Sequence, residues 1–177
     1  CSSIWGSQAY ETPYSTDATG FGPAWVNPLF ENNAAVGGGM ALGVANENEQ
    51  AEVSKQFVID AITHDDNLTS NPVFAELRNQ LFALKEIDRG QGTTLEGRFE
   101  QVERVKALEL VLDAAVEHSD RLAIQLRTHL QMLRATISSH LDKQTLIVGG
   151  DGWAFDIGLQ MMVHVLQSQL NVTVMVL

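Results

Sequence analysis

Residues 143–177 constrain the fold of this 177-residue chain more than any other stretch. Residues 145–148 form a short, uninterrupted run rich in β-branched side chains and end at a pair of glycines, which is typical of a buried strand entering a tight loop. Residues 154–169 carry apolar side chains at helical spacing, and residues 172–177 again favour a buried strand. Strand, helix and strand in this length predict one right-handed βαβ crossover with parallel strands, and therefore an α/β fold.

Composition divides the chain into three blocks. Residues 1–46 are rich in Gly, aromatic residues, Asn and Pro, and include a helix-like run from near Leu29; residues 47–142 hold most of the charged side chains; residues 143–177 hold the βαβ unit. Gly37-Gly38-Gly39 lies within the helix-like run, where each glycine costs about 1 kcal/mol relative to alanine. Close packing or a nearby cofactor is therefore expected at these glycines.

The middle block, residues 47–142, predicts a helical connection. Thr93 or Thr94 is expected to start one amphipathic helix, and a second follows after a turn or a kink near residues 118–120. A shorter helix is expected from Val73 to Lys85, after a proline at the tolerated first position. The apolar side chains that define the two longer helices are Phe99, Val102, Val105, Leu108, Val111, Leu112 and Ala115, and then Leu122, Leu126, Leu130, Leu133 and Ile137.

The charge of the chain excludes some partners. Its 22 acidic and 11 basic residues give a net charge of −11, which argues against binding to nucleic acid or to anionic membranes. No stretch approaches the roughly 18 apolar residues of a transmembrane helix. Apart from a lipid anchor, considered next, the chain is therefore expected to be soluble and cytoplasmic.

Cys1 is the only cysteine, so no disulfide can form within the chain and no four-cysteine metal site can be completed from it. The chain starts at this cysteine rather than at Met, which indicates a processed protein or a piece of something longer. A bacterial lipoprotein also matures to an N-terminal cysteine that carries lipid. A lipid-anchored or non-catalytic binding protein is therefore the alternative to an enzyme.

The strongest local signal is Gly149-Gly150-Asp151-Gly152-Trp153, between the predicted strand and helix. Backbone amides at the carboxyl end of a parallel strand commonly hold phosphates, and glycine allows close approach. The carboxylate of Asp151 beside a phosphate requires a cation, and Mg²⁺ accepts one or two carboxylates together with phosphate oxygens. On the tripeptide alone, a simple turn after a strand is the competing interpretation.

Two separated motif blocks resemble the thiamine-diphosphate-binding domain of the pyruvate:ferredoxin (flavodoxin) oxidoreductases. The matching stretches are Cys1-Ser2-Ser3-Ile4-Trp5-Gly6, Thr12-Pro13-Tyr14, Gly22-Pro23-Ala24-Trp25, Leu29-Phe30-Glu31, and residues 149–158, which read Gly-Gly-Asp-Gly-Trp-Ala-Phe-Asp-Ile-Gly. The resemblance covers about half of the chain, while residues 47–142 match only as a helical connection. It implies an incomplete thiamine-diphosphate-binding fold, a parallel sheet flanked by helices, with that connection inserted.

The resemblance also implies the cofactors and the residues that bind them. Cys1 would ligate the [4Fe–4S] cluster nearest the thiamine, with its three fellow ligands outside this chain. Asp151 would ligate Mg²⁺, and Gly150, Gly152 and Trp153 would line the diphosphate. The remaining metal ligands and the substrate-contacting asparagine would lie beyond Leu177.

The implied reaction is the oxidative decarboxylation of pyruvate with coenzyme A, with electrons passing through iron–sulfur clusters to ferredoxin or flavodoxin. A variant would deliver electrons to NADP through a fused flavoprotein. The implied partners are the remaining domains of the same enzyme and a second subunit in a homodimer. The segment alone is expected to be inactive.

Several side chains have simpler interpretations. Histidines 64, 118, 129 and 140 show no metal-site spacing and are expected on solvated helix surfaces, and Asp156 is expected to interact with a helix dipole rather than to act in catalysis. Trp5 and Trp25 fit either a core or a cofactor wall.

Overall fold

The computed structural model describes residues 32–85, 94–141 and 143–177. The chain forms two compact units. The first combines Cys1–Ala45 with Lys143–Leu177, and the second is Asn46–Asp142. Cys1, Trp5, Trp25 and the motifs before residue 32 lie outside the described residues.

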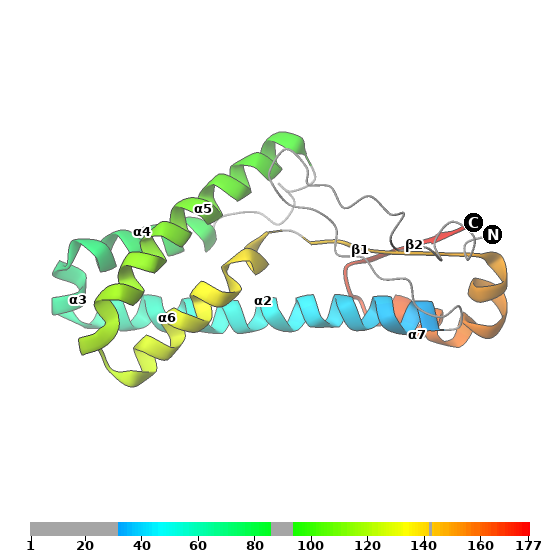
Figure 1. Ribbon diagram of the computed structural model, residues 1–177, viewed down its shortest axis with the longest axis horizontal. Helices are drawn as coiled ribbons and strands as arrows, with labels where there is room; N and C mark the ends of the chain where they lie inside the picture. The colour runs from blue at the N-terminus through cyan, green and yellow to red at the C-terminus, as the bar shows by residue number, and fades with distance from the viewer. Residues whose placement is uncertain (1–31, 86–93, 142) are drawn as a thin grey trace. The chain divides into compact units, whose positions relative to one another are not determined.

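The first unit contains the predicted βαβ arrangement. Strand β1 (Thr145–Gly149) pairs in parallel with β2 (Val172–Val176), with Thr145 opposite Val172 and Gly149 opposite Val176. Between them lie the π-helical turn η6 (Trp153–Ile157) and helix α7 (Leu159–Gln167), as Figure 1 shows. The strands, their parallel pairing and the helical character of the connection are confirmed.

A small apolar core holds this unit together. Its buried members come from the start of α2 (Asn33–His64), from β1 and from the helical segment between the strands: Ala34, Ile147, Trp153, Ala154, Met162 and Val165. On β2, Val172 and Val174 pack against this core, which is the alternation expected of a half-buried strand. The predictions of buried strands at residues 145–148 and 172–177 are therefore wrong in part, since Leu146 of β1 and Met175 and Val176 of β2 are exposed.

Close packing was predicted for the three consecutive glycines of α2, and the structure shows it at two of them. A Cβ at Gly37 would lie 2.5 Å from Cδ1 of Ile147, and a Cβ at Gly38 would lie 2.7 Å from Cγ2 of Val165. None of the described residues lies within 4 Å of a Cβ built at Gly39. The helix therefore approaches β1 and α7 at distances that only glycine permits at Gly37 and Gly38.

The sequence did not predict the extent of α2 or the break before α7. Helix α2 continues through residue 46, where the composition changes, and ends at His64. The helix expected over residues 154–169 begins as a π-helical turn, and the regular α-helix starts only at Leu159. The reason is local packing around Trp153, described below.

The second unit is a set of packed helices. After α2 come α3 (Asp66–Ser70) and α4 (Pro72–Lys85), then α5 (Leu95–Glu117), the 3₁₀ turn η4 (His118–Arg121), α6 (Ile124–Thr136) and the 3₁₀ turn η5 (Ile137–His140). Pro72 is the first residue of α4, and the break near residue 118 is a turn. Within this unit α4 packs along α5, and α5 along α6 (Figure 1).

Capping side chains explain where these helices begin. The Asp65 carboxylate accepts from the backbone N–H of Asn67 at 2.9 Å, and Asn71 Oδ1 accepts from Val73 at 3.0 Å. The Thr94 hydroxyl accepts from Gly97 at 3.1 Å. Of the two threonines predicted to start α5, Thr94 is therefore the N-cap.

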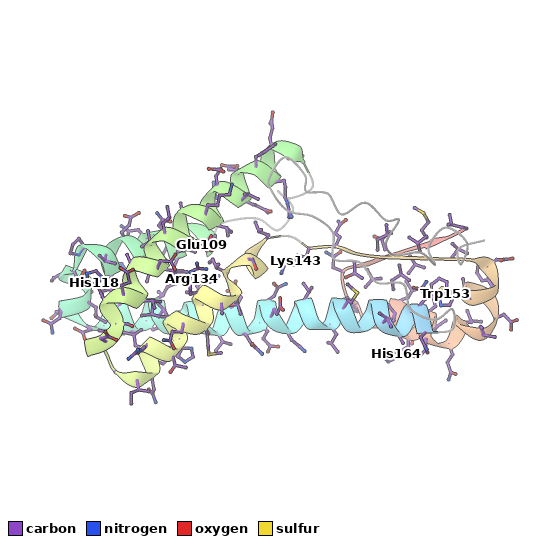
Figure 2. All side chains as sticks on the ribbon, viewed as in Figure 1. Glu109, His118, Arg134, Lys143, Trp153 and His164 are labelled. Atoms are coloured by element: carbon purple, nitrogen blue, oxygen red, sulfur yellow. The ribbon has the colours of Figure 1, made fainter. Side chains whose placement is uncertain are left out.

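The predicted apolar faces of α5 and α6 contribute to the core of this unit, together with side chains of α2, α3 and α4. Leu108, Leu112, Leu130 and Leu133 are fully buried, whereas Phe99 at the start of α5 is largely exposed. On the outside, Arg134 of α6 pairs with Glu109 at 2.8 Å and with Asp113 of α5 (Figure 2). The hydrogen bond to Asp113 is the largest cause that raises the pKa of Arg134.

The described structure is mostly helical with a two-stranded parallel sheet, which is compatible with an incomplete α/β fold. In the described part of the chain, no helix is both long and apolar enough to cross a membrane.

Candidate functional site

The Gly-Asp-Gly turn lies directly at the carboxyl end of β1. Gly149 is the last strand residue, Gly150 is buried, and Asp151 and Gly152 are exposed. The Gly150 carbonyl accepts a hydrogen bond from the backbone N–H of Ala154 at 3.1 Å, so the turn closes into the helical segment at once. The structure thus brings Gly150, Asp151 and Gly152 together at the sheet edge where ligands of parallel sheets bind.

The carboxylate of Asp151 forms no hydrogen bond or ion pair with the described residues. It is exposed, and it follows a buried glycine at the strand end. A single free carboxylate beside exposed backbone is what a partly hydrated Mg²⁺ with phosphate ligands requires from a protein. The turn therefore fits a metal-bridged diphosphate by the chemistry of its donor groups.

The side chain of Trp153 is only 1% exposed and belongs to the core of the first unit (Figure 2). Its indole lies against two glycines, Gly149 and Gly158. The indole Nε1 is buried and has no hydrogen-bond partner among the described residues. The family resemblance implied that Trp153 lines the diphosphate, but the sequence did not predict its contact with Gly149 and Gly158.

Asn33 is a residue that the sequence analysis missed. From the first turn of α2, its Nδ2 donates a hydrogen bond to the backbone carbonyl of Val148 at 2.7 Å. In a parallel strand the backbone N–H and C=O groups of successive residues point to opposite sides of the strand. The carbonyl of Gly149 points toward β2, because it accepts a hydrogen bond from the N–H of Leu177. Asn33 therefore covers the outer edge of β1 just before the turn. An asparagine at a helix start is a recognisable signal, but its partner 115 residues away is not.

The other predicted site residue, Cys1, lies outside the described residues. Within residues 32–85, 94–141 and 143–177, no group of three His, Cys, Asp or Glu side chains could hold a metal ion. Asp151 is therefore the predicted metal ligand whose position the structure gives.

The histidines are partly as predicted. His64 and His118 are exposed, each with its ring Nδ1 at 2.7 Å from a carbonyl of the preceding helical turn. His129 differs, because it is half-buried, stacks on Phe57 with ring centroids 4.1 Å apart, and lies 3.3 Å from the Ser54 hydroxyl. Asp156 is exposed within η6, ahead of the first turn of α7.

Comparisons with known proteins give the class of protein. No protein-family model matches the chain. Among curated proteins, it is 34% identical over 178 residues to "Pyruvate:ferredoxin oxidoreductase" of Moorella thermoacetica and 33% identical over 177 residues to "Pyruvate-flavodoxin oxidoreductase" of Trichormus variabilis. Each match covers 100% of this chain and 13% of the relative. It is also 29% identical over 192 residues to "Pyruvate dehydrogenase [NADP(+)]" of Cryptosporidium parvum, covering 10% of that protein.

The matched relatives are named as oxidoreductases, so the chain is similar to a segment of redox enzymes. More particularly, it is homologous along its whole length to a segment of the pyruvate:ferredoxin and pyruvate-flavodoxin oxidoreductases. This confirms the family that the sequence motifs indicated, while the assignment to its thiamine-diphosphate-binding domain stays a prediction. The chain spans about 13% of the length of these relatives.

Proposed function

We propose that this chain is the segment of a pyruvate:ferredoxin or pyruvate-flavodoxin oxidoreductase that holds the diphosphate end of thiamine diphosphate through Mg²⁺. The observation that carries the proposal is the Gly-Asp-Gly turn at the carboxyl end of β1, in a chain that matches such enzymes along its whole length. The parallel pair with its helical connection would then be part of a thiamine-diphosphate-binding fold.

The proposed roles of Asp151 and of the backbone follow from the absence of basic side chains near the turn in the sequence. No Lys or Arg follows Lys143, so the basic side chains that often neutralise a phosphate are missing from the sequence around the turn. Asp151 would bind Mg²⁺, and the cation would meet the charge of the diphosphate. The backbone of Gly150, Gly152 and Trp153 would border the diphosphate, where glycine lets the ligand approach the amides closely.

Cys1 is proposed to ligate a [4Fe–4S] cluster, with its fellow ligands contributed from outside this chain. A cysteine thiolate is the usual ligand of such clusters. Cys1 and Asp151 would then serve the two ends of the electron path, one at the cluster and one at the cofactor.

The proposed reaction converts pyruvate and coenzyme A to acetyl-coenzyme A and CO₂, and its two electrons leave through iron–sulfur clusters to ferredoxin or flavodoxin. When bound, thiamine diphosphate supplies the reactive carbon centre, and the protein supplies placement and a path for electrons. The part assigned to this chain is to hold the metal and the diphosphate in a fixed position.

A second electron acceptor has one specific observation in its favour. The relative from Cryptosporidium parvum is named for NADP⁺ and matches the whole chain at 29% identity. The relatives named for ferredoxin or flavodoxin match at 31–36% identity, so we favour those acceptors. The lipid-anchored or non-catalytic alternative is not favoured, because the matched relatives are named as enzymes.

The test uses the complete polypeptide that contains this chain, purified without oxygen. We expect an iron–sulfur signal in electron paramagnetic resonance that grows when pyruvate and coenzyme A are added, and reduction of added ferredoxin or flavodoxin. Reduction of NADP⁺ in their place would support the second acceptor. A protein without iron–sulfur signal and without pyruvate-dependent reduction would contradict the proposal.

A further inference from the structure

We propose that Trp153 is a positioning residue: its buried indole holds the Gly-Asp-Gly turn in place from the core, and Gly149 and Gly158 are glycines because the indole occupies the space of their side chains. This inference deepens the proposed function and rests on it. It assigns the tryptophan of the motif to the support of the metal-binding turn rather than to contact with the cofactor through its ring.

Gly149 contacts the six-membered ring of Trp153. A Cβ built at Gly149 would overlap Cε3 and would lie 2.9 Å from both Cδ2 and Cζ3. All three atoms belong to the side chain of Trp153. Gly149 is also the last residue of β1 and binds the N–H of Leu177 through its carbonyl. The indole therefore lies directly on the end of the strand from which the turn departs.

Gly158 contacts the five-membered ring of the same indole. A Cβ there would overlap Cδ1, would lie 2.6 Å from Nε1, and would lie 2.5 Å from the backbone carbonyl oxygen of Trp153. The N–H of Gly158 donates to that carbonyl at 2.9 Å, which is the i→i+5 bond of the π-helical turn. Gly158 is thus restricted both by the side chain and by the backbone of Trp153.

The π-helical turn and the buried indole together determine where Asp151 lies. Residues two apart on a helix are separated by about 200° around the axis, so an inward Trp153 places Asp151 on the opposite side. Consistent with this, Trp153 is buried and Asp151 is exposed. A π-turn adds one residue to a helical turn and is frequent at functional sites. The π-helical turn accommodates the indole of Trp153, while Met162 and Val165 of α7 remain buried in the core.

The contact pattern predicts an asymmetric double-mutant cycle in the complete polypeptide. We would measure the dissociation constant of thiamine diphosphate by equilibrium dialysis of cofactor-depleted protein, at several Mg²⁺ concentrations. W153L, G149A and G158A should each weaken Mg²⁺-dependent binding about 10- to 100-fold, the range seen when the support of a metal ligand is lost. G39A is the matched control, because no atom in the described part of the chain lies within 4 Å of its new methyl group.

The double variants separate the two glycines. G149A/W153L should bind no more weakly than W153L, because the atoms that the new methyl group at Gly149 would overlap belong to the removed ring. G158A/W153L should bind more weakly than W153L, because the backbone oxygen of residue 153 remains. High Mg²⁺ should restore part of the binding in W153L, which loss of folded protein would not allow. If W153L does not fold, W153F is the milder variant for the same Mg²⁺ titration.

The outcomes are distinct. Variants that melt at lower temperature but keep the wild-type Mg²⁺ dependence would show that Trp153 only packs the core, which would overturn this inference and leave the proposed function standing. Independent, multiplying effects of G149A and W153L would also overturn it. A wild-type protein that binds no thiamine diphosphate would overturn the proposed function and this inference with it.

Discussion

The four glycines of α2 differ in how close the nearest atoms lie to the position that a side chain would occupy. Gly37 and Gly38 lie against Ile147 and Val165, whereas Gly39 and Gly43 have no neighbour among the described residues where a side chain would stand. Glycine within a helix is unfavourable by about 1 kcal/mol relative to alanine. The first two glycines are therefore explained by close packing, and the other two are not explained by the described structure.

These surroundings predict opposite effects of alanine. G37A and G38A should each destabilise the first unit by about 1–3 kcal/mol, the usual cost of overpacking a core. G39A and G43A should stabilise α2 by up to about 1 kcal/mol through helix propensity. Hydrogen exchange of β1 and α7 in the complete polypeptide measures the effect, with faster exchange expected only for the first pair. Equal exchange in all four variants would contradict the close approach of α2 to this core.

At the scale of elements, one hydrogen bond joins α2 to the strand that precedes the site. Asn33 reaches the carbonyl of Val148, and the neighbouring Asn32 is exposed. N33A should leave that carbonyl without its donor, at a cost of about 1–3 kcal/mol. N33D should cost more, because a carboxylate would face a carbonyl oxygen. Hydrogen exchange of β1 is the measurement and N32A the control, and unchanged exchange in N33D would refute the bond.

The N-cap of α5 gives a second prediction at this scale. Thr94 accepts a hydrogen bond from the backbone N–H of Gly97, at the start of a 23-residue helix. T94A should destabilise the helix start by about 1 kcal/mol, while T94S should retain the cap. Exchange of the first-turn amides should be faster in T94A alone. Equally fast exchange in both variants would show that the hydroxyl is not the cap.

Periodicity predicted most elements because it depends on side chains along one segment. The helical spacing of Leu108, Leu112, Leu130 and Leu133 indicated α5 and α6, and all four are buried. The π-turn was not predicted, because it depends on the packing of the Trp153 indole against Gly149 and Gly158. The same holds for Asn33 and for the stacking of His129 on Phe57, which join separate segments.

At the scale of the molecule, the first unit exposes many apolar side chains. On the segment between the strands, Phe155 is 67% and Ile157 57% exposed, and Leu166, Met175 and Leu177 are also largely exposed. Exposed apolar side chains that gather into a patch usually mark an interface. Since the chain spans about 13% of its relatives, we expect the remaining polypeptide to cover part of this surface.

This surface predicts the behaviour of the segment by itself. The 177-residue chain should bind a hydrophobic dye strongly and associate in solution, and it should not oxidise pyruvate. The complete polypeptide should bind much less dye per segment. Dye fluorescence and light scattering compare the two, and a monomeric segment with little dye binding would contradict the exposed surface.

The central claim is that Asp151 binds the Mg²⁺ that holds the diphosphate. Its most direct test is the Mg²⁺-dependent binding of thiamine diphosphate to the complete polypeptide, compared between the wild type and D151N. The wild type should bind the cofactor in the presence of Mg²⁺ and lose it to a chelator. D151N should fold normally, since Asp151 is exposed and unpaired among the described residues, but should bind at least about tenfold more weakly. Equal, Mg²⁺-dependent binding by both proteins would contradict the claim.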